Sequence, residues 1–335
     1  MKIAMLAPIA WATPPAAYGP WEQVTSHLTE GLVARGVDVT LFATGTSRTA
    51  GKLVATVPAG YAERPGGDVK VMEHDHISRV MSRAAEFDLV HNQFDFMPLI
   101  HAQHLPVPMV TTIHGFSSER IVPLYERYDP YCAYVSISDA NRHPKLSYAA
   151  TVYNGLDVNQ FTVRESPGDY LLYFGRIHPE KGAAEAIEIA RRAGKPLVLA
   201  GLVQDEAYFR ERVEPHLNDH DVRYLGNVGP AERDRLMGGA LALLHPISFA
   251  EPFGLSVAEA MLCGTPVIAH ALGSMPELIV EDRSGYLTQT TADAAAAVGR
   301  CADLDRPEIA RMARSRFSVD RMVEGYLEVY QKLLQ

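Results

Sequence analysis

Short apolar runs alternate with segments of helical periodicity along most of the chain, and Gly, Pro or Asn residues separate many of them. Apolar runs without polar alternation are typical of strands that are buried on both faces of a parallel sheet. Helical segments between successive strands supply the crossover connections that parallel strands require. The pattern therefore predicts an α/β protein built from doubly wound parallel sheets.

The first half of the chain contains one series of such elements. Strands are predicted at residues 3–8, 37–43, 89–91, 109–113, 134–137 and 150–152, an edge strand at 54–57, and helices at 21–35 and 80–87. The helix at 21–35 ends before Gly36, a residue type that commonly terminates helices. The polar segment from 46 to 75 shows no clear periodicity outside the edge strand.

A second series begins after the turn Asn154–Asp157 and a polar stretch that contains Pro167 and Gly168. Strands are predicted at 170–174, 196–201, 222–225, 241–245 and 266–270, and helices at 182–193, 206–217, 231–238 and 256–262. Residues 319–334 form a last amphipathic helix, for which core packing is the default interpretation. A chain of 335 residues with two such series is expected to form two domains.

Composition excludes some classes of protein. The net charge of −9 argues against a nucleic-acid-binding protein, which usually carries a basic surface. The cysteines Cys132, Cys263 and Cys301 form no metal or redox motif and no disulfide framework, so a cytoplasmic location is expected. The N-terminal apolar run fits a buried strand better than a signal peptide, and no segment approaches transmembrane length.

The most informative segment runs from His245 to Ala260 and contains two carboxylates, Glu251 and Glu259, eight residues apart around a Phe-Gly turn. Glu251 lies on the loop after a predicted strand and Glu259 in the first turn of the next helix, at the edge where open parallel sheets bind ligands. The backbone amides of that helix start also suit an anion. However, Ser256 and Glu259 also fit a capping box, and Glu251 also fits a solvated loop charge. Both interpretations are open on these residues alone.

A second strand-to-helix junction, from Phe174 to Gly182, carries Arg176 and Lys181. Lys181 falls near a helix N-terminus, where the macrodipole disfavours a cation unless an anion is bound. Arg binds phosphate through paired hydrogen bonds and Lys acts as a point charge. The alternative is a surface Arg176 together with a Lys181 that pairs with Glu180 or Glu185.

The first strand-to-helix loop, residues 17–21, contains Gly19 and Pro20 but lacks the Gly-x-Gly-x-x-Gly fingerprint of nicotinamide and flavin enzymes. This absence argues against an ordinary dehydrogenase. His114 follows a predicted strand, and a functional role and a structural hydrogen bond fit it equally well. The segment His74–His76 resembles a metal-ligand set only superficially, and we expect it on the solvated surface.

Together, the ordered motifs resemble retaining glycosyltransferases of family 4, which have the GT-B fold. The matching pieces are the Gly19 loop, residues 112–115 (Thr-Ile-His-Gly), 154–157 (Asn-Gly-Leu-Asp), 175–176 with 181–182, 225–228, and 251–259, which matches the family's Glu-x7-Glu element. The resemblance implies two Rossmann-like doubly wound parallel-sheet domains facing a cleft. Residues 1–162 plus 318–335 would bind the acceptor, and residues 168–317 the donor.

The resemblance also implies a reaction and a set of site residues. A sugar would pass from a nucleotide-diphosphate sugar, with UDP- or GDP-sugars as the expected donors, to a hydroxyl acceptor by same-face attack, without a metal or other cofactor. The implied catalytic residues are His114, Glu251, Arg176 and Lys181. The implied donor-binding residues are Gly19, Gly175, Asn227, Val228, Phe253, Gly254, Leu255, Ser256, Val257 and Glu259.

Within that set, Arg176 and Lys181 would hold the diphosphate, Glu259 the ribose hydroxyls and Glu251 the transferred sugar. His114 would touch the donor sugar near the reaction centre. The chain departs from the family at Pro20, where the family typically has a second glycine, and proline lacks an amide proton. This departure affects the predicted acceptor and phosphate role of the loop.

The acceptor stays open between a small molecule, a glycan and a lipid-linked molecule, and so does peripheral membrane contact. Two other functions also remain at this point. One is a GT-B sugar-nucleotide epimerase or hydrolase. The other is a non-catalytic protein that binds a sugar nucleotide or partners another transferase.

Overall fold

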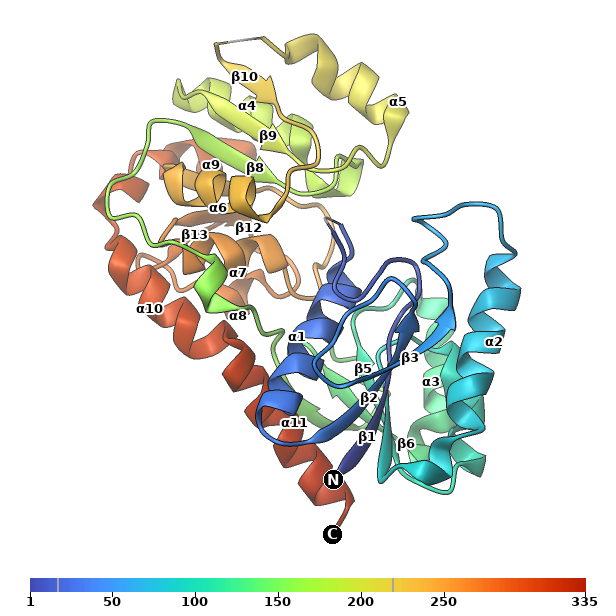
Figure 1. Cartoon of the computed structure of the whole chain (residues 1–335). Coiled ribbons are helices and arrows are strands. Elements are labelled where there is room, and N and C mark those ends of the chain that lie inside the picture. Colours follow the sequence, from blue (N-terminus) through green and yellow to red (C-terminus); the bar gives the residue numbers. More distant parts are fainter. Residues whose placement is uncertain (17, 219) are drawn as a thin grey trace. The chain divides into compact units, whose positions relative to one another are not determined.

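The computed structural model describes residues 1–16, 18–218 and 220–335, which divide into two compact units (Figure 1). Unit 1 contains Met1–Leu156 together with Val319–Gln335, and unit 2 contains Asp157–Ser318. Residues 157–162 and 318, which we assigned to the first domain, belong to unit 2. Both units have the Rossmann-like parallel architecture that the alternating pattern predicted.

The described residues of unit 1 form a parallel sheet of seven strands in the order β3-β2-β1-β4-β5-β6-β7. The strands are β1 (Lys2–Leu6), β2 (Asp38–Thr44), β3 (Lys52–Val57), β4 (Leu89–Asn92), β5 (Met109–Ile113), β6 (Cys132–Ser136) and β7 (Tyr148–Thr151). The order reverses between β1 and β4, so loops that leave these two strands diverge. Such a topological switch point is where open α/β sheets bind ligands.

Helices cover both faces of the unit 1 sheet (Figure 1). They are α1 (Pro20–Ala34), α2 (Val69–Met81), α3 (Val122–Tyr128) and α11 (Val319–Leu333). On one face, Ile77 and Val80 of α2 join a core with Ala4 and Leu6 of β1. On the other, α11 packs against α1 so closely that a Cβ at Gly31 would lie 2.5 Å from a methyl group of Val323. Helix α11 is therefore part of unit 1.

Unit 2 repeats the plan with six strands, among its described residues, in the order β10-β9-β8-β11-β12-β13. The strands are β8 (Leu171–Phe174), β9 (Leu197–Ala200), β10 (Val222–Tyr224), β11 (Ala242–His245), β12 (Val267–His270) and β13 (Gly285–Thr288). The helices are α4 (Ala183–Ala193), α5 (Glu206–Tyr208), α6 (Pro230–Gly239), α7 (Leu255–Leu262), α8 (Met275–Leu278), α9 (Thr291–Val298) and α10 (Arg306–Phe317). The switch point of this sheet lies between β8 and β11.

A buried arginine fastens the start of α10 to the rest of unit 2. The Arg306 side chain, 3% exposed, donates to the carbonyl oxygens of Arg164, Gly238 and Ala240 and to Thr265 Oγ1 at 2.6–3.0 Å. Gly238 and Ala240 lie at the C-terminal end of α6, where helix carbonyls lack intrahelical partners. A guanidinium has five N–H donors and no acceptor, so one side chain satisfies several such groups.

Two predicted helices differ from the structure. The helix expected at 80–87 is wrong, because the main helix is α2, whose Asp68 cap accepts a hydrogen bond from Val71 N at 3.2 Å. Most residues of α2 face solvent and only His76, Ile77 and Val80 are buried, so the sequence shows too few apolar positions to predict this helix. The helix expected at 206–217 is irregular: α5 continues as a π-helical turn at Phe209–Val213 and a 3-10 turn at Glu214–His216.

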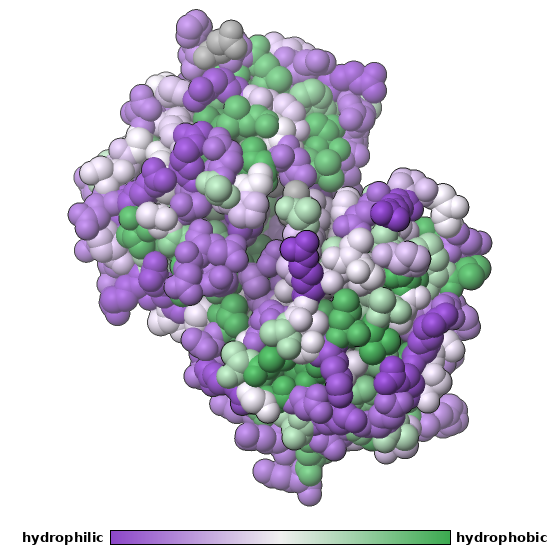
Figure 2. Space-filling view, in the orientation of Figure 1, coloured by the Kyte–Doolittle hydropathy of each residue, from purple (hydrophilic) through white to green (hydrophobic). Residues whose placement is uncertain are grey.

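Among the described residues, no helix combines the length and the apolar character needed to cross a lipid bilayer. In the view of Figure 2, hydrophobic residues form several separate groups among hydrophilic ones. Apolar atoms make up a large share of the surface of most folded proteins, so these groups alone indicate no binding site.

Candidate active site

Lys181 and Glu251 form an ion pair at the switch point of unit 2. Lys181 precedes α4 on the connection from β8, and Glu251 follows β11, the strand beside β8. Lys181 Nζ donates to Glu251 Oε2, and each side chain is only 13% exposed. Lys181 thus pairs with neither Glu180 nor Glu185, and Glu251 is not a solvated loop charge.

The surroundings of Glu251 keep it ionised. Burial opposes its ionisation, but the imidazole of His245, whose Nε2 lies 3.7 Å from Glu251 Oε2, and the charge of Lys181 lower the pKa of Glu251 to about 2. Within the described part of the chain, the hydrogen bond and the ion pairs of the Glu251 carboxylate all involve Oε2. Glu251 therefore offers a carboxylate oxygen that can accept a hydrogen bond from a hydroxyl group.

Glu259 lies in α7 and is almost fully buried. Its Oε1 accepts a hydrogen bond from Arg233 Nη1 at 2.8 Å, while burial raises its pKa and the charge of Arg233 opposes that rise. The N-cap of α7 is Gly254 rather than Ser256, so the capping-box interpretation is wrong. Glu259 is therefore available for another partner through its second oxygen.

The turn before α7 exposes backbone donors. Gly254 adopts φ +89°, and its carbonyl accepts from Val257 N at 3.1 Å and Ala258 N at 3.3 Å. The amides of Leu255 and Ser256 have no such acceptor among the described residues. Phe253 beneath them is buried, with its ring edge-on to that of Phe317 at 5.7 Å. Within the predicted donor-binding segment 253–257, the amides of Leu255 and Ser256 are therefore available to an anion, whereas the amide of Val257 is bonded to the Gly254 carbonyl.

The loop 271–274, which we did not predict as part of the site, supports Glu251. Ser274 N donates to the Glu251 carbonyl at 2.9 Å, and Ser274 Oγ donates to the Phe253 carbonyl at 2.6 Å. Gly273 adopts φ +56°, and a Cβ there would lie 2.3 Å from Glu251 N. The dipeptide Gly273-Ser274 after a predicted strand was the sequence signal, because a glycine there permits close backbone approach.

Arg176 lies at the carboxyl end of β8 but does not contact Lys181. Its Nη1 donates to Gln204 Oε1, and its carbonyl accepts from Tyr173 OH at 2.7 Å. Burial raises the pKa of Tyr173, the charge of Arg176 opposes that rise and the charge of Glu251 adds to it. The charges of Arg176 and Glu251 therefore both act on Tyr173, although Arg176 makes its hydrogen bond to Gln204 and not to the Lys181–Glu251 pair.

The remaining predicted donor residues of unit 2 lie on adjacent loops. Gly201 approaches Gly175 so closely that a Cβ at Gly201 would lie 1.9 Å from the Gly175 carbonyl oxygen. Gly201 N donates to the Gly226 carbonyl at 2.8 Å, directly before Asn227 and Val228. Three loops thus meet at the carboxyl edge of β8, β9 and β10, with Asn227 exposed and Val228 half-buried.

In unit 1, His114 follows β5 and is held from two sides. Its Nε2 lies 2.6 Å from Gln93 Oε1, and its ring stacks on Trp21 with centroids 5.2 Å apart. Burial lowers the pKa of His114 to about 3, so the imidazole is neutral near pH 7. Gln93 was not predicted as a site residue, although it directly follows β4, one of the two switch-point strands.

Gly19 is the N-cap of α1, with φ +150°, and Pro20 is the first residue of the helix. A Cβ at Gly19 would lie 2.8 Å from Pro15 and 3.2 Å from Glu22 Oε2. Glu22 is 3% exposed and accepts a hydrogen bond from Trp11 N at 3.2 Å. Burial raises the pKa of Glu22 to about 7. Ala17 of this loop lies outside the described residues.

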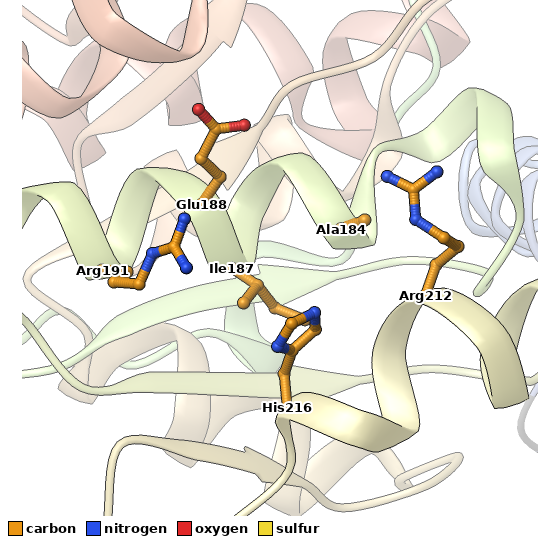
Figure 3. A pocket seen from close by; sticks show the side chains of 6 residues that line it. All are labelled: Ala184, Ile187, Glu188, Arg191, Arg212 and His216. Atoms are coloured by element: carbon orange, nitrogen blue, oxygen red, sulfur yellow. The ribbon is translucent and has the colours of Figure 1, made fainter.

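Other features carry no predicted site residue. A cavity of about 150 Å³ in unit 2 is lined by α4 and the segment after α5, with Arg191 and Arg212 on its rim (Figure 3).

His76, expected on the surface, is buried and hydrogen-bonds the Ala7 carbonyl and Thr56. Residues 1–16, 18–218 and 220–335 contain no group of three or more His, Cys, Asp or Glu side chains arranged to hold a metal ion.

Two family models match consecutive parts of the chain. The model for glycosyltransferase family 4 matches residues 21–159, and the model for glycosyl transferases group 1 matches residues 159–313. The chain is a family 4 glycosyltransferase of the GT-B class.

Individual proteins with similar sequences or structures are consistent with the assignment of this chain to the glycosyltransferases. A glycogen synthase of Mycobacterium tuberculosis is 26% identical over 96% of this chain and 91% of its own length. The crystal structure of a glycosyltransferase involved in avilamycin A biosynthesis is 26% identical, with a TM-score of 0.73 over 100% of this chain and 98% of that one. Anabaena HepE, solved in complex with UDP-glucose, shares the fold, with a TM-score of 0.74, 19% identity and coverage of 99% and 100%.

The tight contact at Gly273 generates a first prediction for the glycosyltransferase. Gly273→Ala should lower turnover by at least about tenfold, because the new Cβ would displace the backbone of Glu251 and shift its carboxylate. Product formation in the variant measures the effect. Gly299→Ala is the control, because nothing lies within 4 Å of a Cβ at Gly299. Equal activity of both variants would show that the loop tolerates displacement.

The raised pKa of Glu22 generates a second prediction. The pKa of Glu22 is higher in the folded protein, at about 7, than its ordinary value of 4.5. The folded state is therefore most stable, as far as Glu22 is concerned, below pH 4.5, and its free energy of unfolding falls as the pH rises through about 7. Glu22→Gln mimics the neutral form, so it should raise stability at pH 8 by about 1–3 kcal/mol and have little effect at pH 4.5. Urea unfolding at both pH values tests this. Glu328→Gln, at an exposed position of α11, is the control. A pH-independent effect of Glu22→Gln would contradict the prediction.

Proposed function

We propose that the glycosyltransferase moves a sugar from a nucleotide-diphosphate sugar to a hydroxyl acceptor with retention of anomeric configuration. The observation that carries this proposal is the Lys181–Glu251 pair beside the free amides of Leu255 and Ser256. A cation and helix amides suit a diphosphate, while a carboxylate that is ionised near neutral pH suits sugar hydroxyls. Both kinds of group lie on the connections that follow β8 and β11, at one switch point.

The donor would bind to unit 2 with its parts distributed over the loops described above. Its diphosphate would contact Lys181, Arg176 and the α7 amides, and its sugar hydroxyls would donate to Glu251. The ribose hydroxyls would donate to the second oxygen of Glu259. The base would lie beside Asn227 and Val228. UDP is a reasonable first candidate, because Anabaena HepE binds UDP-glucose and shares this fold.

Charge develops on the departing diphosphate as its bond to the anomeric carbon breaks. Lys181 and Arg176 would stabilise that charge, an electrostatic effect that often supplies much of the rate enhancement. The acceptor oxygen would form its bond to the same face of the sugar, and its proton would pass to a phosphate oxygen of the leaving group. No enzyme nucleophile is required. Because protein cations neutralise the phosphates, we propose that the reaction needs no divalent metal.

In unit 1, the acceptor would bind near His114 and the loop before α1. The stacked pair of Trp21 and His114 offers a ring surface, and Glu22 offers a carboxyl group whose pKa is raised to about 7. Pro20 supplies no amide, so in this chain any backbone donor at the start of α1 comes from Trp21 or later residues. A small molecule, a glycan and a lipid-linked molecule all meet the requirement for an acceptor hydroxyl.

Nucleotide binding is the first test. In EDTA, a thermal-shift screen with UDP, GDP, ADP, TDP and CMP should give a clear shift with one diphosphate, on the order of 5 °C at 100 times its Kd. Arg176→Ala should reduce that affinity about tenfold or more. Arg192→Ala is the control, because Arg192 pairs with Glu188 on the surface of α4. Absence of a shift with every nucleotide, or a shift that requires a divalent ion, would contradict the proposal.

Turnover is the second test, using the sugar form of the diphosphate that binds and water as the acceptor. Glu251→Gln should lower sugar release by about a hundredfold, because it removes the charge that accepts the hydroxyls, while diphosphate binding persists. Glu180→Gln is the control, because Glu180 is an exposed neighbour of Lys181. Early NMR spectra should show the released sugar in the anomeric form of the donor, and the opposite anomer would overturn the retaining mechanism.

A further inference from the structure

His114 is connected to the interior of unit 1 through Gln93. Gln93 Oε1 lies 2.6 Å from His114 Nε2, and Gln93 Nε2 lies 3.1 Å from His91 Nε2 and 3.3 Å from Thr112 Oγ1. All four side chains are buried. The amide of Gln93 therefore joins His91 of β4 to His114, which directly follows the adjacent strand β5.

Helix α11 completes this network from the far end of the sequence. Tyr326 OH lies 2.7 Å from Thr112 Oγ1, and Tyr330 OH lies 2.6 Å from His91 Nδ1. Both phenols are fully buried, which raises the pKa of each and keeps each hydroxyl protonated. The two tyrosines thus hold the groups that in turn hold Gln93.

The structure places the Gln93 amide nitrogen toward His91 and Thr112, and this orientation implies where the protons lie. If the Gln93 amide donates to His91 Nε2, then His91 carries its proton on Nδ1 and donates it to Tyr330. The second N–H of the Gln93 amide donates to Thr112 Oγ1, which shares a hydrogen bond with Tyr326 OH. The Gln93 carbonyl oxygen, which can only accept, is left facing His114.

This orientation determines which ring nitrogen of His114 carries the proton. A neutral imidazole has one N–H donor and one acceptor nitrogen, and burial keeps His114 neutral. Because Gln93 Oε1 accepts the hydrogen bond from His114 Nε2, the proton of the His114 ring resides on Nε2, and His114 Nδ1 keeps its lone pair. No other hydrogen bond of the His114 ring occurs among the described residues, and Trp21 stacking restricts rotation of the ring.

We propose that Gln93 is a positioning residue that fixes His114 in the Nε2–H tautomer, so that Nδ1 accepts a hydrogen bond from a substrate hydroxyl. Tyr326 and Tyr330 of α11 set the orientation of Gln93 through Thr112 and His91. The substrate contact rests on the proposed function, whereas the tautomer does not. An oxygen acceptor such as a carbonyl would not be recognised by this tautomer, but a hydroxyl would.

The tautomer is measured directly by two-bond ¹H–¹⁵N NMR of the ligand-free protein at pH 7, with the His114 signals assigned by their loss in His114→Gln. We expect the Nε2–H pattern in the wild type. Gln93→Leu should produce a mixture of tautomers. Gln93→Glu keeps the acceptor but adds a charge, so it should retain Nε2–H and raise the His114 pKa by about one to three units.

Kinetics with the donor found by the binding screen then link the tautomer to function. Gln93→Leu should lower kcat by about tenfold with diphosphate affinity unchanged, and Gln93→Glu should add an ionisation to the pH profile of kcat that the wild type lacks. In Tyr326→Phe and Tyr330→Phe, a smaller fraction of His114 should leave the Nε2–H tautomer than in Gln93→Leu. Tyr134→Phe is their control, because among the described residues the buried Tyr134 OH donates to the Tyr125 carbonyl, outside this network.

Retention of a single Nε2–H tautomer in Gln93→Leu, together with an unshifted His114 pKa in Gln93→Glu, would overturn the proposal. An unchanged kcat in Gln93→Leu despite mixed tautomers would overturn its functional part. Failure of every donor to react, with the NMR results as expected, would count against the proposed function and leave the hydrogen-bond assignment intact.

Discussion

The contact between Lys181 and Glu251 is the interaction on which the proposed chemistry of unit 2 depends. Removing either partner would leave an uncompensated buried charge, which is strongly destabilising, whereas the intact pair adds little net stability over apolar residues. Its retention is therefore better explained by ligand binding than by folding. In the proposed function, a diphosphate that approaches Lys181 would replace the attraction of Glu251 and free the carboxylate for hydroxyl groups. Donor binding would then exchange one set of charge contacts for another without leaving a charge unpaired.

Much of the fold follows from local patterns in the sequence. Apolar runs located most strands, because strands buried on both faces lack polar alternation. The region from 46 to 87 was harder, because α2 shows solvent a mostly polar surface and only His76, Ile77 and Val80 are buried. His76 illustrates the limit: a histidine between polar neighbours fits a surface, yet its ring satisfies the Ala7 carbonyl inside the core.

The site was predictable in its components and less so in its contacts. Spacing and the resemblance identified Glu251, Glu259 and Lys181, but the partners of these residues lie on other strands, at sequence separations that local patterns do not encode. Lys181 pairs with a residue 70 positions away, and His114 with Gln93 across 21 positions. Arg233, Gln93 and Ser274 were missed for the same reason, since each acts through a neighbour brought close only by the parallel sheet.

The discontinuity of unit 1 has a consequence for synthesis of the protein. Unit 2 is one uninterrupted segment, whereas unit 1 needs Val319–Gln335 to cover its sheet and to supply the Tyr326 and Tyr330 hydroxyls. On the ribosome, residues 1–156 would emerge with part of their apolar surface uncovered and would wait while the whole of unit 2 is translated. The order of emergence therefore makes the first half of the chain the part that chaperones must protect for longest.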